Sequence, residues 1–326
     1  MIAAIGAFDG FHKGHQSLLR AARIRSEEAG TDWGIVTFEF NPDALLSPPK
    51  FKSLYTIPER KLLETFFRVP TTARLVFTKE MSQMTPARFL DHITAKLGVR
   101  GVVVGEEFRF GKDRSGTTEL LASESRERGW TFDAVPLLRD SGGEVVSSTA
   151  IRKAVAAGDM AGAWKMQGYP FFFAGRVVHG NERGRVLEYP TANLNLSEAK
   201  APMRHGVYAT IVRASDDWYV GAANAGLNPT FGDVSGMRFE VNLLDFDGDL
   251  YGREITVFII EHIRDEIRFD SADSLKVQMR EDARVIREKG TRAMEAHLEL
   301  WNALKTIEPL GHVQHQQRKG QKIRRV

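Results

Sequence analysis

The chain has 326 residues, 42% of them hydrophobic and 27% charged, which is typical of a folded globular protein long enough for two domains. It contains no cysteine, which excludes disulfides, thiolate zinc sites and cysteine nucleophiles and fits a cytoplasmic location. It also has no run of about 18 apolar residues that could span a membrane. The net charge of +3 suggests a nucleic-acid partner, but five of the 45 basic residues lie in the last nine positions, and the rest of the chain has 40 basic and 42 acidic residues.

The first half of the chain alternates short apolar strands with amphipathic helices. Thr85 and Pro86 suit the start of one helix, and Gly98 suits its end. This alternation predicts parallel strands joined by crossovers, and hence a doubly wound α/β sheet that binds ligands at the carboxyl ends of its strands. We predict strands at residues 2–5, 35–38, 75–77, 102–104 and 132–135, and helices at 15–29, 58–68, 86–97, 117–128 and 148–157.

The pattern changes near Gly168, beyond which strand-like runs follow one another with little helix between them. Their alternation of apolar and polar residues predicts a small closed antiparallel β-barrel, followed by one helix over residues 271–304. We therefore predict an α/β domain over residues 1–168 and a barrel domain with a C-terminal helix over 169–305. Residues 306–326 form a basic tail with few apolar residues, which predicts disorder and at most weak contact with RNA. The barrel strands are expected at residues 171–178, 206–213, 218–224, 237–246 and 254–261.

A glycine- and histidine-rich segment directly follows the first predicted strand. It reads Gly-Ala-Phe-Asp-Gly-Phe-His-Lys-Gly-His over residues 6–15 and opens the first predicted helix. Glycines let a ligand approach the backbone, and a helix amino terminus offers N–H groups and a positive dipole to an anion. His12 and His15 can face one anionic group, so we predict a phosphate-binding loop. Their spacing also suits zinc, but no third His or Cys follows at a suitable distance.

This segment resembles the His-x-Gly-His element of the nucleotidyltransferases and, with its Gly-x-Phe-Asp-Gly start, the bacterial FAD synthetases. The similarity continues through residues 37–39, 103–111 and 146–152, so it covers the first domain. It implies that the FMN phosphate attacks the α-phosphorus of ATP, giving FAD and pyrophosphate. His12 and His15 are then catalytic and stabilise charge on the triphosphate. The ATP-binding residues that the resemblance implies are Gly6, Phe8, Asp9, His12, His15, Ser148, Thr149 and Arg152.

Two positions depart from the FAD synthetase pattern. Those enzymes usually carry Pro-His-Pro where this chain has Phe-Asn-Pro at residues 40–42, and Asp or Asn where it has Glu107. The resemblance implies that Asn41 and Glu107 lie on the flavin side of the site. Because an amide cannot carry the positive charge of an imidazolium, we expect slowed adenylylation rather than a different reaction.

The second domain carries Pro-Thr-Ala-Asn at residues 190–193 and Glu240 on a predicted strand. Thr191 and Asn193, two residues apart in an extended segment, point the same way and can hold Mg²⁺ between ATP phosphates. Glu240 lies on the polar side of its strand, where it can accept the proton of an attacking hydroxyl. Each feature alone is more typical of a turn or a solvated strand. Their order and spacing together favour a functional site.

From about residue 171 to 287 this half resembles riboflavin kinase. The similarity implies that Glu240 accepts the proton of the riboflavin 5′-hydroxyl as its oxygen attacks the γ-phosphorus of ATP. It also implies that Thr191 and Asn193 bind Mg²⁺. The remaining predicted residues are Gly180, Gly184 and Arg185, in a flap over the ATP phosphates, and Arg264 and Phe269, beside the flavin ring.

The sequence thus predicts a bifunctional transferase, a riboflavin kinase and FMN adenylyltransferase with two separate sites. Both reactions need ATP and Mg²⁺, and riboflavin, FMN and FAD are the substrates and products. Two alternatives stay open. One is a related adenylyltransferase for another acceptor, such as a pantetheine or nicotinamide nucleotide, which would not need the second domain. The other is a catalytically impaired flavin- or RNA-binding paralogue, which would not need Glu240.

Overall fold

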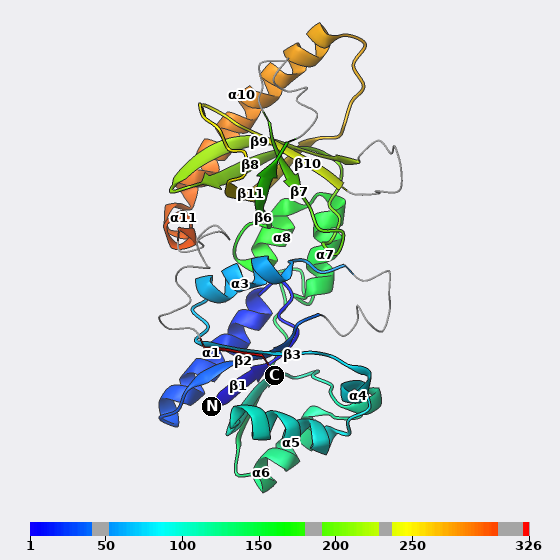
Figure 1. Ribbon diagram of the computed structural model, residues 1–326, viewed down its shortest axis with the longest axis vertical. Coiled ribbons are helices and arrows are strands. Elements are labelled where there is room, and N and C mark those ends of the chain that lie inside the picture. The colour runs from blue at the N-terminus through cyan, green and yellow to red at the C-terminus, as the bar shows by residue number, and fades with distance from the viewer. Residues whose placement is uncertain (41–51, 180–190, 228–236, 306–321, 326) are drawn as a thin grey trace. The chain divides into compact units, whose positions relative to one another are not determined.

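The chain divides into two units (Figure 1) in a computed structural model that describes residues 1–40, 52–179, 191–227, 237–305 and 322–325. The sheet unit comprises Met1–Phe51, Leu63–Ser148 and Gln317–Val326. The barrel unit comprises Lys52–Leu62 and Thr149–Gln316. Two helices after residue 148 and the short segment Lys52–Leu62 thus belong with the barrel, whereas the sequence predicts the boundary at residues 168–169.

The sheet unit contains a parallel sheet with the strand order β12-β3-β2-β1-β4-β5. The order reverses at β1, so the predicted doubly wound architecture is confirmed. Its strands are β1 (Ile2–Ile5), β2 (Trp33–Phe38), β3 (Thr71–Leu75), β4 (Gly101–Gly105), β5 (Thr131–Val135) and β12 (Lys322–Arg325), and its helices are α1 (Lys13–Glu28), α4 (Lys79–Ser82), α5 (Pro86–Leu97), the 3₁₀ turn Lys112–Arg114 and α6 (Thr118–Glu127).

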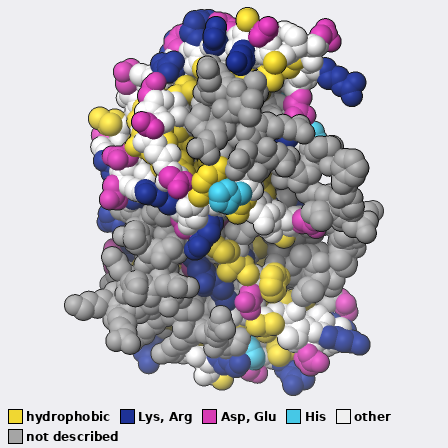
Figure 2. Space-filling view, turned by 45° about the horizontal axis from the view of Figure 1, so that its top comes forward, with side chains coloured by type: hydrophobic (Ala, Val, Ile, Leu, Met, Phe, Trp, Pro, Cys, Tyr) yellow, Lys and Arg dark blue, Asp and Glu magenta, His cyan; other side chains and the backbone are white. Residues whose placement is uncertain are grey.

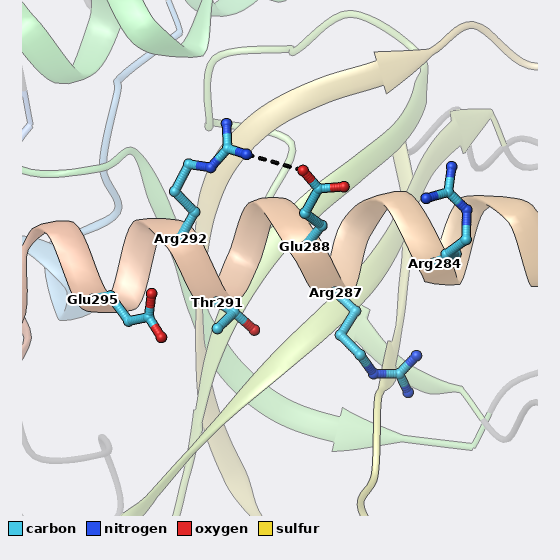
Figure 3. A pocket seen from close by; sticks show the side chains of 6 residues that line it. All are labelled: Arg284, Arg287, Glu288, Thr291, Arg292 and Glu295. Carbon is cyan, nitrogen blue, oxygen red and sulfur yellow. Dashed lines mark hydrogen bonds and ion pairs between the residues drawn. The ribbon is translucent and has the colours of Figure 1, made fainter.

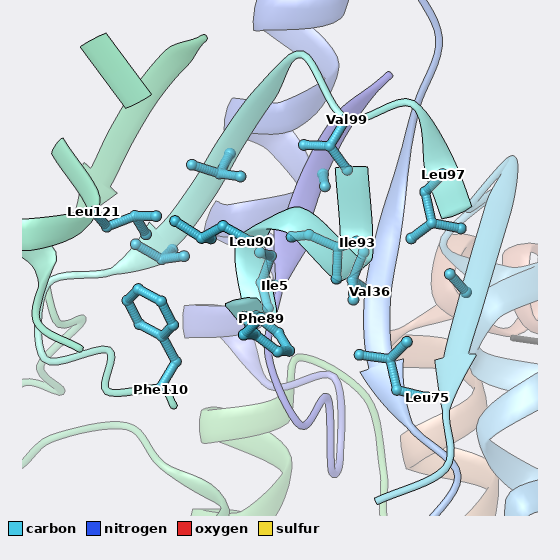
Figure 4. Packing of buried hydrophobic residues seen from close by; sticks show 14 of the residues in the cluster. Ile5, Val36, Leu75, Phe89, Leu90, Ile93, Leu97, Val99, Phe110 and Leu121 are labelled. Atoms are coloured by element: carbon cyan, nitrogen blue, oxygen red, sulfur yellow. The ribbon is translucent and has the colours of Figure 1, made fainter. Parts of the chain in front are cut away.

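Apolar side chains on one face of this sheet pack against α5 (Figure 4). Ile5, Val36 and Leu75, from three neighbouring strands, belong to one buried cluster with Leu90 and Ile93 of the helix. Buried apolar area of this kind is the main favourable term in folding. It holds the carboxyl ends of β1 and β2 in fixed positions.

The predicted ends of α5 are confirmed, but the third strand is displaced. Thr85 caps the helix and Gly98 ends it in the left-handed region at φ 60°. The third strand was predicted at residues 75–77, whereas β3 covers Thr71–Leu75. The sequence does not predict this strand because a charged residue, Arg74, lies within it. Arg74 is nevertheless buried, and its Nη2 donates to both carboxylate oxygens of Glu64.

The barrel unit contains the predicted closed antiparallel barrel, with the strand order β10-β7-β6-β11-β8-β9. Phe171–Phe173, predicted as a buried strand, are fully buried, and the Phe173 and Phe239 ring centroids lie 4.8 Å apart. The strands are β6 (Phe172–Val178), β7 (Ala192–Asn195), β8 (Gly206–Ala214), β9 (Asp217–Leu227), β10 (Met237–Leu243) and β11 (Glu254–Arg264).

Two helices precede the barrel and two follow it: α7 (Ser148–Ala157), α8 (Met160–Gln167), α10 (Ala272–Ala296) and α11 (Leu298–Leu304). The predicted C-terminal helix after the barrel is confirmed, but it is not continuous, because it breaks at His297 (φ −131°, ψ 36°). The break turns the buried Trp301 of α11 onto Trp218 and Phe258, at ring-centroid distances of 5.4 and 5.7 Å. Packing of this aromatic side chain therefore overrides the continuous helical pattern.

Of the tail predicted to be disordered, residues 306–326, the structure describes Lys322–Arg325. These four residues form β12, which pairs in parallel with β3. An edge strand offers unpaired backbone N–H and C=O groups, so backbone pairing with β3 orders these four residues, and the prediction of disorder is wrong for them. In the face shown in Figure 2, side chains of both charge signs are interspersed over the described surface. No helix among the described residues is long and apolar enough to cross a membrane.

A buried ion pair anchors the segment Lys52–Leu62 within the barrel unit. Glu59, in α3 (Ile57–Phe66), lies 2.5 Å from Lys200 Nζ, and both side chains are only 2% exposed. Glu59 also accepts the backbone N–H of Ala174 (3.0 Å), and Lys200 donates to the carbonyl of Phe172 (2.7 Å). The ammonium group therefore replaces its lost water with charged and polar partners. It lies 4.3 to 5.7 Å from the ring centroids of Tyr55, Phe171, Phe172 and Phe173.

The buried phenol of Tyr55 predicts a loss of stability at high pH. Burial and the neighbouring Tyr169 raise the pKa of Tyr55 well above its usual value. Because an unfolded tyrosine ionises near pH 10, the neutral phenol stabilises the fold fully below about pH 10, and this contribution is lost as the pH rises toward the raised pKa. We expect the melting temperature to fall less steeply between about pH 9 and about pH 11 in Tyr55→Phe than in the parent protein. Equal slopes would contradict this assignment.

Candidate functional site

In the sheet unit, the predicted histidine pair lies at the amino terminus of α1. His12 caps the helix, because its Nδ1 accepts the backbone N–H of His15 at 3.4 Å. The two imidazole rings stack with their centroids 3.7 Å apart, and His12 is 8% exposed. A Cβ added to Gly14 would lie 3.1 Å from the His12 ring, so a side chain there would crowd the pair. Two imidazoles thus lie at the positive end of a helix dipole.

The loop that leads to these histidines has an unusual backbone. Phe8 and Phe11 adopt positive φ angles of 48° and 37°, which is uncommon for bulky residues. Both rings are fully buried, and the Phe8 ring lies 5.1 Å from that of His15. Phe8 was predicted to bind ATP. Its side chain is buried beside His15, so its backbone is the part available for that role, which stays a prediction.

Two other segments of the sheet unit are hydrogen-bonded to this loop. Thr37, at the end of β2, donates its hydroxyl to the carbonyl of Ala7 (3.0 Å). Ser148, at the start of α7, donates to the carbonyl of Asp9 (2.6 Å). The loop that carries the buried Asp9 and the histidine pair is thereby tied to the end of β2 and to the start of α7. Thr37 was missing from the predicted site residues, although it belongs to the segment 37–39 that carries the resemblance.

The other predicted residues of the first site are distributed as follows. Glu107 is exposed just beyond the end of β4. Thr149 and Arg152 follow Ser148 on α7 but belong to the barrel unit, where Arg152 Nη2 donates to Thr149 Oγ1 at 3.5 Å. Their roles stay predictions. Asn41 lies outside the described residues.

In the barrel unit, the register of the strands brings the predicted kinase residues together. Glu240 of β10 lies directly opposite Asn193 of β7. Residues paired in this way project from the same face of the sheet. The neighbouring residues Phe239 and Val241 are fully buried, so Glu240 lies on the outer face of the barrel. Arg238 Nε lies 3.7 Å from the Glu240 carboxylate, and both side chains are about three-quarters buried.

The residues Thr191 and Asn193 fit a magnesium ion by their chemistry. Asn193 donates its Nδ2 to the backbone carbonyl of Thr191 (3.5 Å), which leaves the amide oxygen for a different partner. A hydroxyl and an amide oxygen are ligands that Mg²⁺ accepts, and substrate phosphates and water commonly supply the rest.

A pair of stacked rings lies next to the predicted flap. His179 follows the end of β6, and its ring lies 3.9 Å from that of Tyr251 at an angle of 17°. Both residues lie within residues 171–287, which resemble riboflavin kinase, but neither is among the predicted site residues. The predicted flap residues Gly180, Gly184 and Arg185 lie outside the described residues.

The predicted flavin-side segment after β11 is anchored at two points. Arg264 Nε and Nη2 donate to the carboxylate of Asp282 on α10 at 2.6 to 3.1 Å, and Arg264 lies 6.0 Å from the Phe269 ring. Arg204 binds both oxygens of Asp265 at 2.8 and 2.7 Å, and this contact lowers the pKa of the Asp265 carboxyl. The guanidinium of Arg264 is therefore engaged by protein, and it positions the segment against α10.

A shallow hollow on the outer side of α10 is a poor candidate for the nucleotide site (Figure 3). Its arginines are paired with carboxylates, so it lacks the excess positive charge that a triphosphate requires. The pairs are Arg284 with Glu281 (2.7 Å), Arg287 with Asp245 (2.9 Å) and Arg292 with Glu288 (2.9 Å).

Comparisons with known proteins match both units. The family model of FAD synthetase matches residues 1–150, and that of riboflavin kinase matches residues 167–289. Proteins named bifunctional riboflavin kinase/FMN adenylyltransferase are 36% identical over 287 residues in Pseudomonas fluorescens and over 292 residues in Escherichia coli K12. Each alignment covers 88% of this chain and 92% of the relative. A crystal structure from Streptococcus pneumoniae, called a macrolide-efflux protein, has a TM-score of 0.80 and 34% identity over 88% of this chain and 93% of its own.

Proposed function

The chain belongs to the family of bifunctional riboflavin kinase/FMN adenylyltransferases, and on this premise we propose that it makes FMN and then FAD. The barrel unit phosphorylates riboflavin with ATP, and the sheet unit transfers AMP from ATP to FMN. The observation that carries the proposal is that each unit gathers side chains suited to its reaction. His12 is stacked on His15 in one unit, and Glu240 lies opposite Asn193 in the other.

In the kinase reaction, the 5′-hydroxyl oxygen of riboflavin forms a bond to the γ-phosphorus of ATP. The bond between that phosphorus and the bridging oxygen breaks, and ADP leaves. Glu240 takes the hydroxyl proton, and the nearby Arg238 orients its carboxylate. Thr191 and Asn193 would hold Mg²⁺, which would neutralise charge on the phosphates.

In the adenylyl transfer, a phosphate oxygen of FMN forms a bond to the α-phosphorus of ATP, and pyrophosphate leaves. No side chain needs to take a proton from the attacking phosphate. His12, His15 and the backbone N–H groups at the start of α1 stabilise the negative charge on the phosphates. We assign Ser148, which is hydrogen-bonded to the loop through Asp9 O, to the same phosphates.

Incubation of the purified protein with riboflavin, ATP and Mg²⁺, followed by separation of the flavins, tests the proposal. Formation of FMN and FAD supports it. FMN without FAD would indicate that the sheet unit is inactive, and FAD formed only from supplied FMN would indicate that the barrel unit is inactive. Absence of both products would favour the non-catalytic flavin binder. The riboflavin kinase match over residues 167–289 already disfavours an adenylyltransferase for another acceptor.

Glu240→Gln tests the assignment of the proton acceptor. An amide has a similar shape but does not take up the hydroxyl proton, so we expect riboflavin phosphorylation to fall about 100- to 10,000-fold. Adenylylation of supplied FMN is expected to stay unchanged. Glu261→Gln is a matched control, because Glu261 is an exposed strand residue of the same barrel that is paired with Lys289. A kinase rate within about threefold of the parent protein in Glu240→Gln would refute this role for Glu240.

A further inference from the structure

A row of three polar side chains crosses the outer face of the barrel at Glu240. In the antiparallel ladders, Glu240 faces Asn193 of β7 on one side and Asn224 of β9 on the other. Cβ atoms of directly opposite residues are about 4.5–5.5 Å apart. Asn224 is therefore a direct neighbour of the proposed proton acceptor, although the two residues are 16 positions apart in sequence.

Asn224 has a buried acceptor atom without a hydrogen-bond donor. The side chain is half-buried, and its Oδ1 has almost no exposed surface and no hydrogen-bond partner among the described residues. Leaving such an atom unpaired costs stability. An ionised Glu240 accepts but does not donate hydrogen bonds, so it does not satisfy Asn224. A donor on a bound ligand would supply the missing hydrogen bond.

The segment that begins at Arg264, the last residue of β11, lies against Gly206 of β8 and Gly226 of β9, close to Asn224. A Cβ added to Gly226, two residues beyond Asn224, would lie 2.6 Å from Glu266 Oε1. A Cβ added to Gly206, which pairs with Ala225, would collide with the carbonyl oxygen of Arg264. The polar row thus lies beside the segment that carries Arg264 and Phe269. A flavin bound along this segment would have its side chain close to Glu240 and Asn224.

We propose that Asn224 is a further substrate-binding residue of the kinase, whose Oδ1 accepts a hydrogen bond from a hydroxyl of the riboflavin side chain. This inference rests on the proposed kinase function. The ribityl chain carries several hydroxyl groups, each able to donate. One donates to Glu240 and is phosphorylated, and a neighbouring one donates to Asn224. The two contacts together aim the 5′-oxygen at the γ-phosphorus.

The test is the steady-state kinetics of Asn224→Leu in the full-length protein. Leucine has a similar volume but no acceptor, so we expect kcat/KM for riboflavin to fall about five- to tenfold, as for loss of one hydrogen bond. The KM for ATP and the adenylylation of supplied FMN stay unchanged. Lumiflavin, which has the flavin ring but a methyl group in place of the ribityl chain, inhibits phosphorylation equally well in both proteins.

Two further variants separate this role from a structural one. Asn224→Ser retains an oxygen acceptor and is expected to recover part of the lost kcat/KM. Asn195→Leu is the control, because Asn195 is an exposed residue on the same face of β7, opposite Arg238, and it should leave the kinetics unchanged.

Three results would overturn the inference: unchanged kcat/KM for riboflavin in Asn224→Leu, an equal weakening of lumiflavin inhibition, or a parallel rise in the KM for ATP. Its failure is distinguishable from failure of the proposed function. If Glu240→Gln is inactive while Asn224→Leu is fully active, only the inference about Asn224 fails. If Glu240→Gln keeps its kinase activity, the proposed role of Glu240 fails first.

Discussion

His12→Asn is expected to form FAD from FMN about 100- to 1,000-fold more slowly than the parent protein, as for removal of one group that stabilises charge in the transition state. Asparagine can still cap α1, because its side-chain oxygen can accept the His15 N–H that His12 Nδ1 accepts now. It cannot reproduce the imidazole that stacks on His15 at 3.7 Å. The substitution therefore removes the proposed chemistry while keeping the helix start.

The measurement is the rate of pyrophosphate release from ATP with FMN as acceptor. Riboflavin phosphorylation in the same variant is an internal control and should not change. His92→Asn is the matched control, because His92 is a histidine of the same unit on α5, outside the loop. A His12→Asn rate within about threefold of the parent rate would remove His12 from the mechanism.

Lys200→Met is expected to lower the free energy of unfolding of the barrel unit by about 3–5 kcal/mol, because it leaves the Glu59 carboxylate buried without its counter-charge. Methionine fills much of the same volume. Glu59 would keep its hydrogen bond from Ala174 N (3.0 Å), but not the ion pair at 2.5 Å. Urea unfolding measures the loss, followed by the fluorescence of Trp164, Trp218 and Trp301, which lie in the barrel unit.

Two companion variants distinguish a buried charge from lost packing. Removing both charges, in Glu59→Gln with Lys200→Met, should be less destabilising than Lys200→Met by itself. Lys289→Met breaks the exposed pair with Glu261 (2.6 Å) and should cost at most about 1 kcal/mol. If Lys200→Met and Lys289→Met were equally stable, the buried pair would not be the anchor of Lys52–Leu62.

The sequence predicted those parts of the protein whose signals are local. The first strand, the glycines and the two histidines of the first site occupy one stretch of 14 residues, from Ile2 to His15. An apolar run followed by glycines and a helix start predicts a strand, a turn and a crossover helix of a parallel sheet. For the same reason the buried Phe171–Phe173 strand and the ends of α5 at Thr85 and Gly98 could be predicted.

The break at His297 and the displaced β3 show where local patterns mislead. The apolar spacing continues from α10 into α11, so periodicity predicts one helix, and only the packing of Trp301 on Trp218 and Phe258 ends it. In β3, the charged residue Arg74 interrupts the apolar pattern, so the sequence does not predict a buried strand there. Arg74 can be buried because it pairs with Glu64 of α3, and this partner is visible only in the tertiary structure.

The sequence by itself determined the two domain classes, the family and the residues of each motif, because these depend on local periodicity and on short motifs. Only the tertiary structure decided which distant side chains meet. Lys200 lies 141 positions from Glu59, Arg264 is paired with Asp282 on another element, and Asn224 faces Glu240 through the register of two strands. Strand register and loss of water on folding select such partners, and neither is encoded in the local pattern of residues.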